Sequence, residues 1–181
     1  MKKILIITII MFSFFNKTNA GYDQLAHEFS FKSINGGKIN LQNYKDNVIV
    51  VVNVASRCGF TNQYEDLQNL WSKYKDNNLV VVGVPTNNFK QEPGTNKDIK
   101  DFCETNFNIS FPMTEKIDVI GGNAHPFFKW AKENHGRSAI PKWNFHKIII
   151  GKNGRVSGTF TSITKPSSDR FINLIEKEIK N

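Results

Sequence analysis

Cysteine is scarce in this chain, which has only two among its 181 residues, Cys58 and Cys103. Gly59-Phe60-Thr61 follows Cys58, so there is no Cys-x-x-Cys pair. That pair is the usual signature of disulfide oxidoreductases, and this class therefore fits poorly. The histidines also include no pair at helical spacing that would join the cysteines around a zinc ion. We expect no metal and no other cofactor.

Long hydrophobic runs are also lacking, with one exception near the start, from Ile4 to Phe15. Lys2 and Lys3 precede this run, and Thr18-Asn19-Ala20 follows it with small residues. A basic start, an apolar stretch and a small-residue end form the pattern of a secretory signal peptide. A membrane-spanning helix needs about 20 apolar residues, so cleavage after Ala20 is favoured over an uncleaved membrane anchor.

The chain therefore divides into a signal peptide, residues 1–20, and a single domain, residues 21–181. We expect this domain to be exported, periplasmic or secreted, with no stable membrane insertion after cleavage. Acidic residues are outnumbered, 16 against 24 basic ones, which gives a net charge of +8. The lysines are scattered rather than clustered with aromatic residues, which argues against a nucleic-acid partner.

Two cysteines in an exported chain are expected to pair, because an oxidising compartment favours disulfides. Such a bond either staples a long loop permanently or is made and broken during function. The position of Cys58 favours the second role, since it follows an apolar strand and precedes an amphipathic helix. N–H groups at a helix start stabilise a nearby thiolate. The alternative role for Cys58 is that of a small buried hydrophobic residue.

Two β-branched runs, Val48 to Val54 and Leu79 to Val84, predict buried central strands. A helix between them is predicted by residues at helical spacing, namely Tyr64, Leu67, Leu70, Trp71 and Tyr74. This strand, helix, strand unit places Cys58 at the first helical turn of a right-handed crossover. Earlier in the chain, Asn35-Gly36-Gly37 separates two short alternating segments and predicts an N-terminal β-hairpin.

The second half of the chain predicts helices at Asn96 to Phe107 and from Pro126 onward. Phe145 to Ile150 and Arg155 to Phe160 then predict an antiparallel hairpin. A closing helix carries apolar residues on one side, namely Phe171, Leu174, Ile175 and Ile179. This order of elements predicts an α/β domain with a thioredoxin-like fold, in which helices flank a central mixed sheet.

Several separated motifs resemble those of one enzyme family. The motifs are Asn53-Val54-Ala55-Ser56, Cys58-Gly59-Phe60-Thr61, Gln91-Glu92-Pro93-Gly94, Asp118-Val119, His125-Pro126 and Trp143-Asn144-Phe145. By these motifs the chain resembles a cysteine-containing, non-selenium glutathione peroxidase, and the likeness covers almost all of Phe29 to Lys180. The resemblance implies a thiol-dependent peroxidase that reduces hydrogen peroxide and organic or lipid hydroperoxides and protects against oxidative stress.

The resemblance also implies roles for individual residues. Cys58 inherits the role of the peroxide-reacting cysteine, and Trp143 and Asn144 inherit supporting roles beside its sulfur. One position departs from the family, because Asn88 stands where the family normally has glutamine. Asparagine is one methylene shorter, so Asn88 is expected either to reach the sulfur or peroxide through a water or only to cap a turn.

Cys103 aligns with the resolving cysteine of the family's two-cysteine members. By this likeness it attacks the Cys58 sulfenic acid, and the resulting disulfide is reduced by a thioredoxin-like protein or by glutathione. The segment from His125 to Trp143 lacks the extra loop of animal members, which implies a monomer. Two other readings stay open, namely an exported peroxide sensor or disulfide-relay protein with the same cysteines, and a binding module with a static disulfide.

Overall fold

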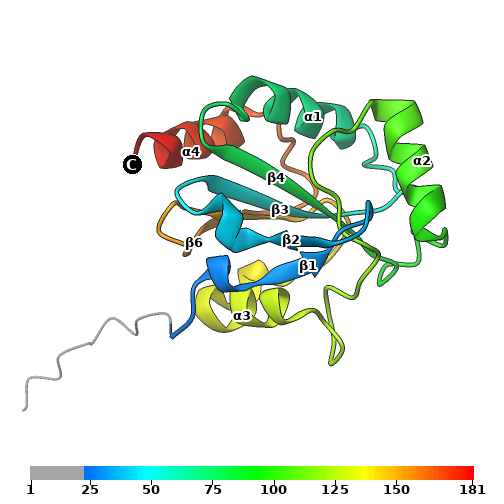
Figure 1. Cartoon of the computed structure of the whole chain (residues 1–181), viewed down its shortest axis with the longest axis horizontal. Coiled ribbons are helices and arrows are strands. Elements are labelled where there is room, and N and C mark those ends of the chain that lie inside the picture. The colour runs from blue at the N-terminus through cyan, green and yellow to red at the C-terminus, as the bar shows by residue number, and fades with distance from the viewer. Residues whose placement is uncertain (1–22) are drawn as a thin grey trace, which may run out of the picture.

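The structure is a computed structural model that describes residues 23–181. The predicted signal peptide, residues 1–20, lies outside this range. Among the residues described, none of the helices has the length and apolar character needed to cross a membrane. The chain forms a mixed α/β domain around one main sheet, with a separate small hairpin (Figure 1).

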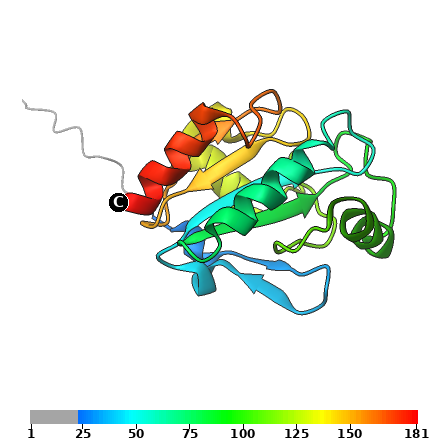
Figure 2. The ribbon, with the colours of Figure 1, turned by 90° about the horizontal axis from the view of Figure 1, so that it is seen from above.

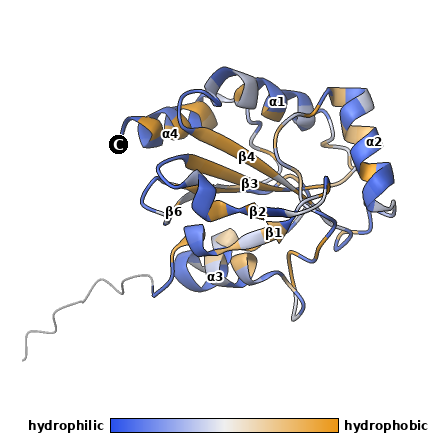
Figure 3. Ribbon diagram, viewed as in Figure 1, coloured by the Kyte–Doolittle hydropathy of each residue, from blue (hydrophilic) through white to orange (hydrophobic). Residues whose placement is uncertain are grey.

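The main sheet has four strands in the order β4-β3-β5-β6. They are β3 (Val48–Val54), β4 (Leu79–Pro85), β5 (Lys147–Ile150) and β6 (Val156–Phe160). β3 and β4 run parallel, whereas β5 lies antiparallel to both β3 and β6. Every residue of β3 and β4 is buried, as their continuous apolar runs predict. Figure 3 shows these two strands as the most hydrophobic part of the ribbon.

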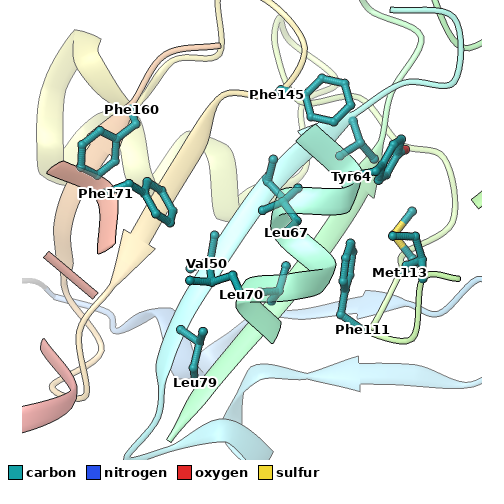
Figure 4. Close-up of a cluster of buried hydrophobic side chains, with 14 of the residues drawn as sticks. Val50, Tyr64, Leu67, Leu70, Leu79, Phe111, Met113, Phe145, Phe160 and Phe171 are labelled. Atoms are coloured by element: carbon teal, nitrogen blue, oxygen red, sulfur yellow. The ribbon is translucent and has the colours of Figure 1, made fainter. Parts of the chain in front are cut away.

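Helices cover both faces of the sheet. α1 (Gln63–Tyr74) and α4 (Asp169–Lys180) lie side by side on one face, and α3 (Pro126–His135) covers the other (Figures 1 and 2). The alternation of side chains along β3 divides the core accordingly, because Val50 packs with α1 whereas Val51 packs with α3. Figure 4 shows Leu67 and Leu70 of α1 on the side of Val50, and Tyr64 of the same helix near Phe145.

The remaining elements lie around this sandwich. α2 (Asn96–Phe107) packs against α1 at one end of the molecule (Figure 1). The small hairpin consists of β1 (Ser30–Lys32) and β2 (Lys38–Asn40), paired antiparallel. Short 3-10 helices span Ala26–Glu28, Leu41–Tyr44 and Gly136–Ala139. The prediction of a thioredoxin-like α/β fold with an N-terminal hairpin and a flanked mixed sheet is confirmed.

Two of the predicted boundaries next to the candidate site were wrong. α1 begins at Gln63 rather than at Cys58, because a series of turns occupies the intervening residues. β5 begins at Lys147 rather than at Phe145, because Phe145 adopts a positive φ of 62° that a strand does not allow. A bulky residue in this conformation carries backbone strain, and such strain is concentrated at functional sites.

Candidate active site

Asn53, near the end of β3, holds the segment that carries the Trp-Asn-Phe motif. Its Nδ2 donates to the Trp143 carbonyl at 3.1 Å, and its Oδ1 accepts from the His146 N–H at 3.2 Å. Its own carbonyl accepts from the Phe145 N–H at 2.6 Å. Asn53 is fully buried, and the first two of these bonds satisfy its polar side chain inside an apolar sheet. They fix the Trp143 to His146 turn at the end of β3, just before the Cys58 segment.

Cys58 lies in the turns between β3 and α1 as a free, buried thiol that is 4% exposed. The N–H of Phe60 points at its sulfur with an N to Sγ distance of 3.5 Å. The Cys58 carbonyl accepts from the Thr61 N–H at 3.1 Å. The expectation that Cys58 occupies the first turn of the helix is therefore wrong, because α1 begins five residues later. The N–H that faces its sulfur belongs to the turn itself.

The two residues before Cys58 are held by the loop that follows β4. Glu92 Oε2 accepts from the Ser56 N–H at 2.7 Å and from the Ser56 hydroxyl at 2.9 Å. The Gln91 carbonyl accepts from the Arg57 N–H at 3.0 Å. Burial raises the pKa of the Glu92 carboxyl, and its bonds from Ser56 act in the opposite direction. This loop thereby fixes the approach of the chain to Cys58.

Trp143 and Asn144 belong to the turn that Asn53 holds at the end of β3. The Trp143 side chain is 42% exposed and lies against Phe89, with ring centroids 5.6 Å apart. Asn144 is fully buried, and its Nδ2 donates to Gln91 Oε1 at 2.9 Å. Asn144 Oδ1 is buried without a hydrogen-bond partner among the described residues. The structure thus brings both residues to the end of the sheet where Cys58 lies.

Asn88 does not direct its amide to this group. Its Oδ1 accepts from the N–H groups of Val119 and Ile120 at 2.7 and 3.2 Å, and from the Thr86 hydroxyl at 3.0 Å. Its Nδ2 donates to the Asp118 carboxylate at 2.7 Å. Both ends of the side chain are therefore committed to a neighbouring loop. The expected role of Asn88 beside the sulfur does not match this geometry, which is that of a loop-fixing residue.

Cys103 lies on the inward side of α2 as a second free, buried thiol. Burial raises the pKa of the Cys103 thiol to about 11, and the neighbouring Tyr64 hydroxyl opposes this effect. Tyr64 is fully buried in α1 and interacts electrostatically with both Cys103 and Cys58. The two thiols and Tyr64 belong to the same apolar cluster. The Cys103 thiol, on the buried side of α2, is therefore protonated at neutral pH.

A small pocket opens beside the Trp143 turn, with a volume of about 260 Å³. Phe60, Trp143 and Ile163 give it apolar walls, and Lys142 and His146 also line it. Burial lowers the pKa of His146 to about 4, so its ring is neutral at pH 7. The pocket joins the turn that contains Cys58 to the turn that contains Trp143. Within residues 23–181, no cluster of three acidic, histidine or cysteine side chains is arranged to hold a metal ion.

A network of buried hydrogen bonds connects β5 and α1 to the turn that carries Asn144. Lys147 is fully buried, and its Nζ donates to Gln63 Oε1 and, at 2.7 Å, to the Thr164 carbonyl. Gln63 Nε2 donates to the Ser162 carbonyl at 2.6 Å, and the Ser162 hydroxyl donates to the Asn144 carbonyl at 2.6 Å. The network therefore links the first residue of α1 to the Trp-Asn-Phe turn.

The buried Lys147 makes stability dependent on pH. Burial lowers its pKa to about 7 from 10.5, so between these values the unfolded chain binds more protons than the folded one. The free energy of unfolding should therefore rise with pH in this window, by about 2 kcal/mol between pH 7 and pH 9 relative to a Lys147→Met variant. Denaturant titrations of both proteins measure this difference. A difference that stays constant or shrinks as the pH rises would contradict the assignment.

Three residues of the site were not identified as site residues from the sequence. Gln91 and Glu92 stood out only as part of a family motif, and Asn53 only as part of another. For Asn53 a signal was available, because it is the single polar residue within the run Val48 to Val54. A polar side chain in a strand that is buried on both faces needs dedicated partners. Gln91 and Glu92 offered no comparable local signal.

The chain is similar to known proteins of one family. The family model described as glutathione peroxidase matches residues 26–132. The chain is 42% identical to a glutathione peroxidase-like peroxiredoxin of Saccharomyces cerevisiae over 147 residues, which cover 78% of this chain and 90% of the relative. It is 41% identical to a hydroperoxy fatty acid reductase of Synechocystis sp., covering 76% of this chain and 87% of that protein.

Solved structures show the same likeness. The crystal structure of Trgpx in apo form matches with a TM-score of 0.70 and 32% identity, covering 88% of this chain and 97% of the other. A thioredoxin-family thiol:disulfide interchange protein from Chlorobium tepidum matches with a TM-score of 0.63 at 14% identity, covering 83% and 92%. The second match concerns the fold alone.

Proposed function

The chain belongs to the glutathione peroxidase family, and from this we propose that it reduces hydroperoxides in a two-cysteine cycle, with Cys58 as nucleophile and Cys103 as resolving thiol. Its class, a thiol-dependent peroxidase, follows from the family. The proposal that Cys58 is the nucleophile rests on one observation. Cys58 is a free thiol, and the Phe60 N–H points at its sulfur. It lies at the end of the sheet where Asn53 holds the Trp143 to His146 turn.

In the first step the Cys58 thiolate attacks one peroxide oxygen. An S–O bond forms as the O–O bond breaks, and the departing hydroxide or alkoxide takes up a proton to leave as water or alcohol. The sulfur is thereby oxidised to sulfenic acid. The Phe60 N–H, the indole N–H of Trp143 and the amide of Asn144 are the donors available to stabilise the developing negative charge.

In the second step the Cys103 sulfur attacks the sulfenic sulfur of Cys58. The S–S bond forms as the S–O bond breaks, the thiol proton joins the departing hydroxide, and water is released. Because bridged Cα atoms lie within about 7 Å and Cys103 is buried on α2, this step requires a local rearrangement of that helix. A dithiol reductant then reduces the disulfide and restores both thiols.

A thioredoxin-like protein is the proposed reductant, since the Saccharomyces cerevisiae relative is named a peroxiredoxin. We also propose that the domain acts as a monomer after export and removal of residues 1–20. The apolar walls of the pocket beside Trp143 favour peroxides with an aliphatic chain in addition to hydrogen peroxide. The name of the Synechocystis relative, a hydroperoxy fatty acid reductase, supports this proposal.

Coupled turnover tests this proposal. The domain from Gly21 to Asn181 is supplied with hydrogen peroxide or a fatty acid hydroperoxide, and either a thioredoxin system or a glutathione system follows peroxide consumption. We expect turnover with thioredoxin, at a higher kcat/KM for the fatty acid hydroperoxide. Turnover with glutathione alone would contradict the proposed reductant. If each protein molecule is oxidised once by peroxide and neither system gives turnover, the alternative function as an exported peroxide sensor would be favoured.

A further inference from the structure

The amide at the position where the resemblance expects glutamine does not face the Cys58 turn. Asn88 stands there, and both ends of its side chain are bonded to Thr86 and to the loop from Asp118 to Ile120. A glutamine lies three residues further along the chain, at Gln91. Its side chain contacts Asn144, one of the residues expected to support the reactive sulfur.

The contacts of Gln91 connect the two sides of the site. Its carbonyl accepts from the N–H of Arg57, the residue directly before Cys58, at 3.0 Å. Its Oε1 accepts from Asn144 Nδ2 at 2.9 Å. Gln91 is half-buried, and its Nε2 has no hydrogen-bond partner among residues 23–181. One residue therefore holds both the Cys58 turn and the Asn144 amide.

The Asn144 amide needs such a partner, because nothing else among the described residues fixes its orientation. Asn144 is fully buried, and its Oδ1 has no hydrogen-bond partner there. A terminal amide rotates by half a turn at little cost unless a hydrogen bond selects one orientation. By accepting one Nδ2 hydrogen, Gln91 holds the amide in the orientation that the structure shows, and the second Nδ2 hydrogen is left to donate elsewhere.

We propose that Gln91, and not Asn88, is the positioning amide of this site: it orients Asn144 beside Cys58 and stabilises the Cys58 thiolate through it. This inference rests on the proposed function for its effect on peroxide reduction. Its effect on the thiolate does not depend on peroxide chemistry, because a thiolate reacts with any electrophile.

Two rates test the proposal in the domain from Gly21 to Asn181. The first is the rate constant of Cys58 with hydrogen peroxide, from single-turnover stopped-flow measurements. The second is the pH dependence of Cys58 alkylation by iodoacetamide, read by peptide mapping. Gln91→Met keeps the size of the side chain and removes its one hydrogen bond, which it accepts from Asn144, while the main-chain bond to Arg57 remains. We expect an alkylation profile shifted to higher pH and a peroxide rate about tenfold lower, because an Asn144 amide without this bond no longer holds its second N–H toward the thiolate.

A double-mutant cycle separates positioning from a general structural effect. If Gln91 acts through Asn144, then Gln91→Met should lower the peroxide rate by less than about twofold in an Asn144→Ala background. Gln68→Met is the matched control, since Gln68 is also half-buried and its amide bonds to Ser110, away from this site. We expect the control to leave both rates unchanged. Gln91→Asn, which is too short for the same contact, should reproduce the loss if Gln91→Met does not fold.

Specific results would overturn the inference. Unchanged alkylation and peroxide rates in Gln91→Met would do so, as would a full tenfold loss in the Asn144→Ala background. A loss in Asn88→Ala equal to that in Gln91→Met would return the amide role to Asn88. If the unmodified protein does not react with peroxide at all, the proposed function fails. The alkylation profiles still decide the role of Gln91 in that case.

Discussion

Replacing Cys58 with serine will reduce hydroperoxide consumption by at least about a thousandfold, with either thioredoxin or glutathione as reductant. A hydroxyl group is not ionised at neutral pH and is a poor nucleophile toward peroxide oxygen, whereas a thiolate is a strong one. The measurement is the stopped-flow rate of peroxide reduction under single-turnover conditions, where the second cysteine and the reductant do not limit the rate.

The Cys58→Ser protein should still fold, which separates loss of chemistry from loss of structure. The thiol makes one hydrogen-bond contact, with the Phe60 N–H, and a serine oxygen is able to accept from the same group. Circular dichroism and thermal unfolding of the two proteins provide the control. A folded Cys58→Ser protein that consumes peroxide at the original rate would place the nucleophile elsewhere.

Replacing Cys103 with serine will reduce thioredoxin-driven turnover by at least about a hundredfold, while the first oxidation of Cys58 keeps its rate. The Cys58 sulfenic acid then has no internal thiol to capture it. Excess peroxide should therefore oxidise Cys58 further to sulfinic acid, which thiols do not reduce. Stopped-flow traces separate the two steps, and peptide mass spectrometry identifies the sulfinic acid.

A serine hydroxyl at this buried position also destabilises α2, so Cys103→Ala serves as the second variant. Both variants should lose turnover, whatever their stability. Circular dichroism adds a further check, because closure of the disulfide should lower helix content in the original protein only. Full turnover with thioredoxin in a folded Cys103→Ala protein would show a one-cysteine cycle.

The fold could be predicted from the sequence because its signals are local. Two β-branched runs marked the central strands, and the apolar spacing from Tyr64 to Tyr74 marked α1. The start of α1 could not be placed as well. Turns between Cys58 and Gln63 carry hydrogen bonds of helix-like spacing, such as Thr61 N–H to the Cys58 carbonyl, so the local pattern does not show where the helix begins.

The candidate site was only partly predictable, because the direction of a side chain depends on distant partners. Motif matching placed Cys58, Trp143 and Asn144 in one group, and the structure brings them to the same end of the sheet. Asn88 was placed beside the sulfur by the same logic. Its bonds run instead to a loop about thirty residues later in the chain. Nothing local to Asn88 indicates that contact.

In the proposed cycle, peroxide oxidises Cys58 and Cys103 captures the product. The most direct measurement is mass spectrometry of the domain from Gly21 to Asn181 after one equivalent of hydrogen peroxide, with peptide mapping. We expect a protein that has lost two hydrogen atoms and contains one peptide pair joined through Cys58 and Cys103. An unchanged mass, or oxygen added at Cys58 while Cys103 remains a free thiol, would contradict it.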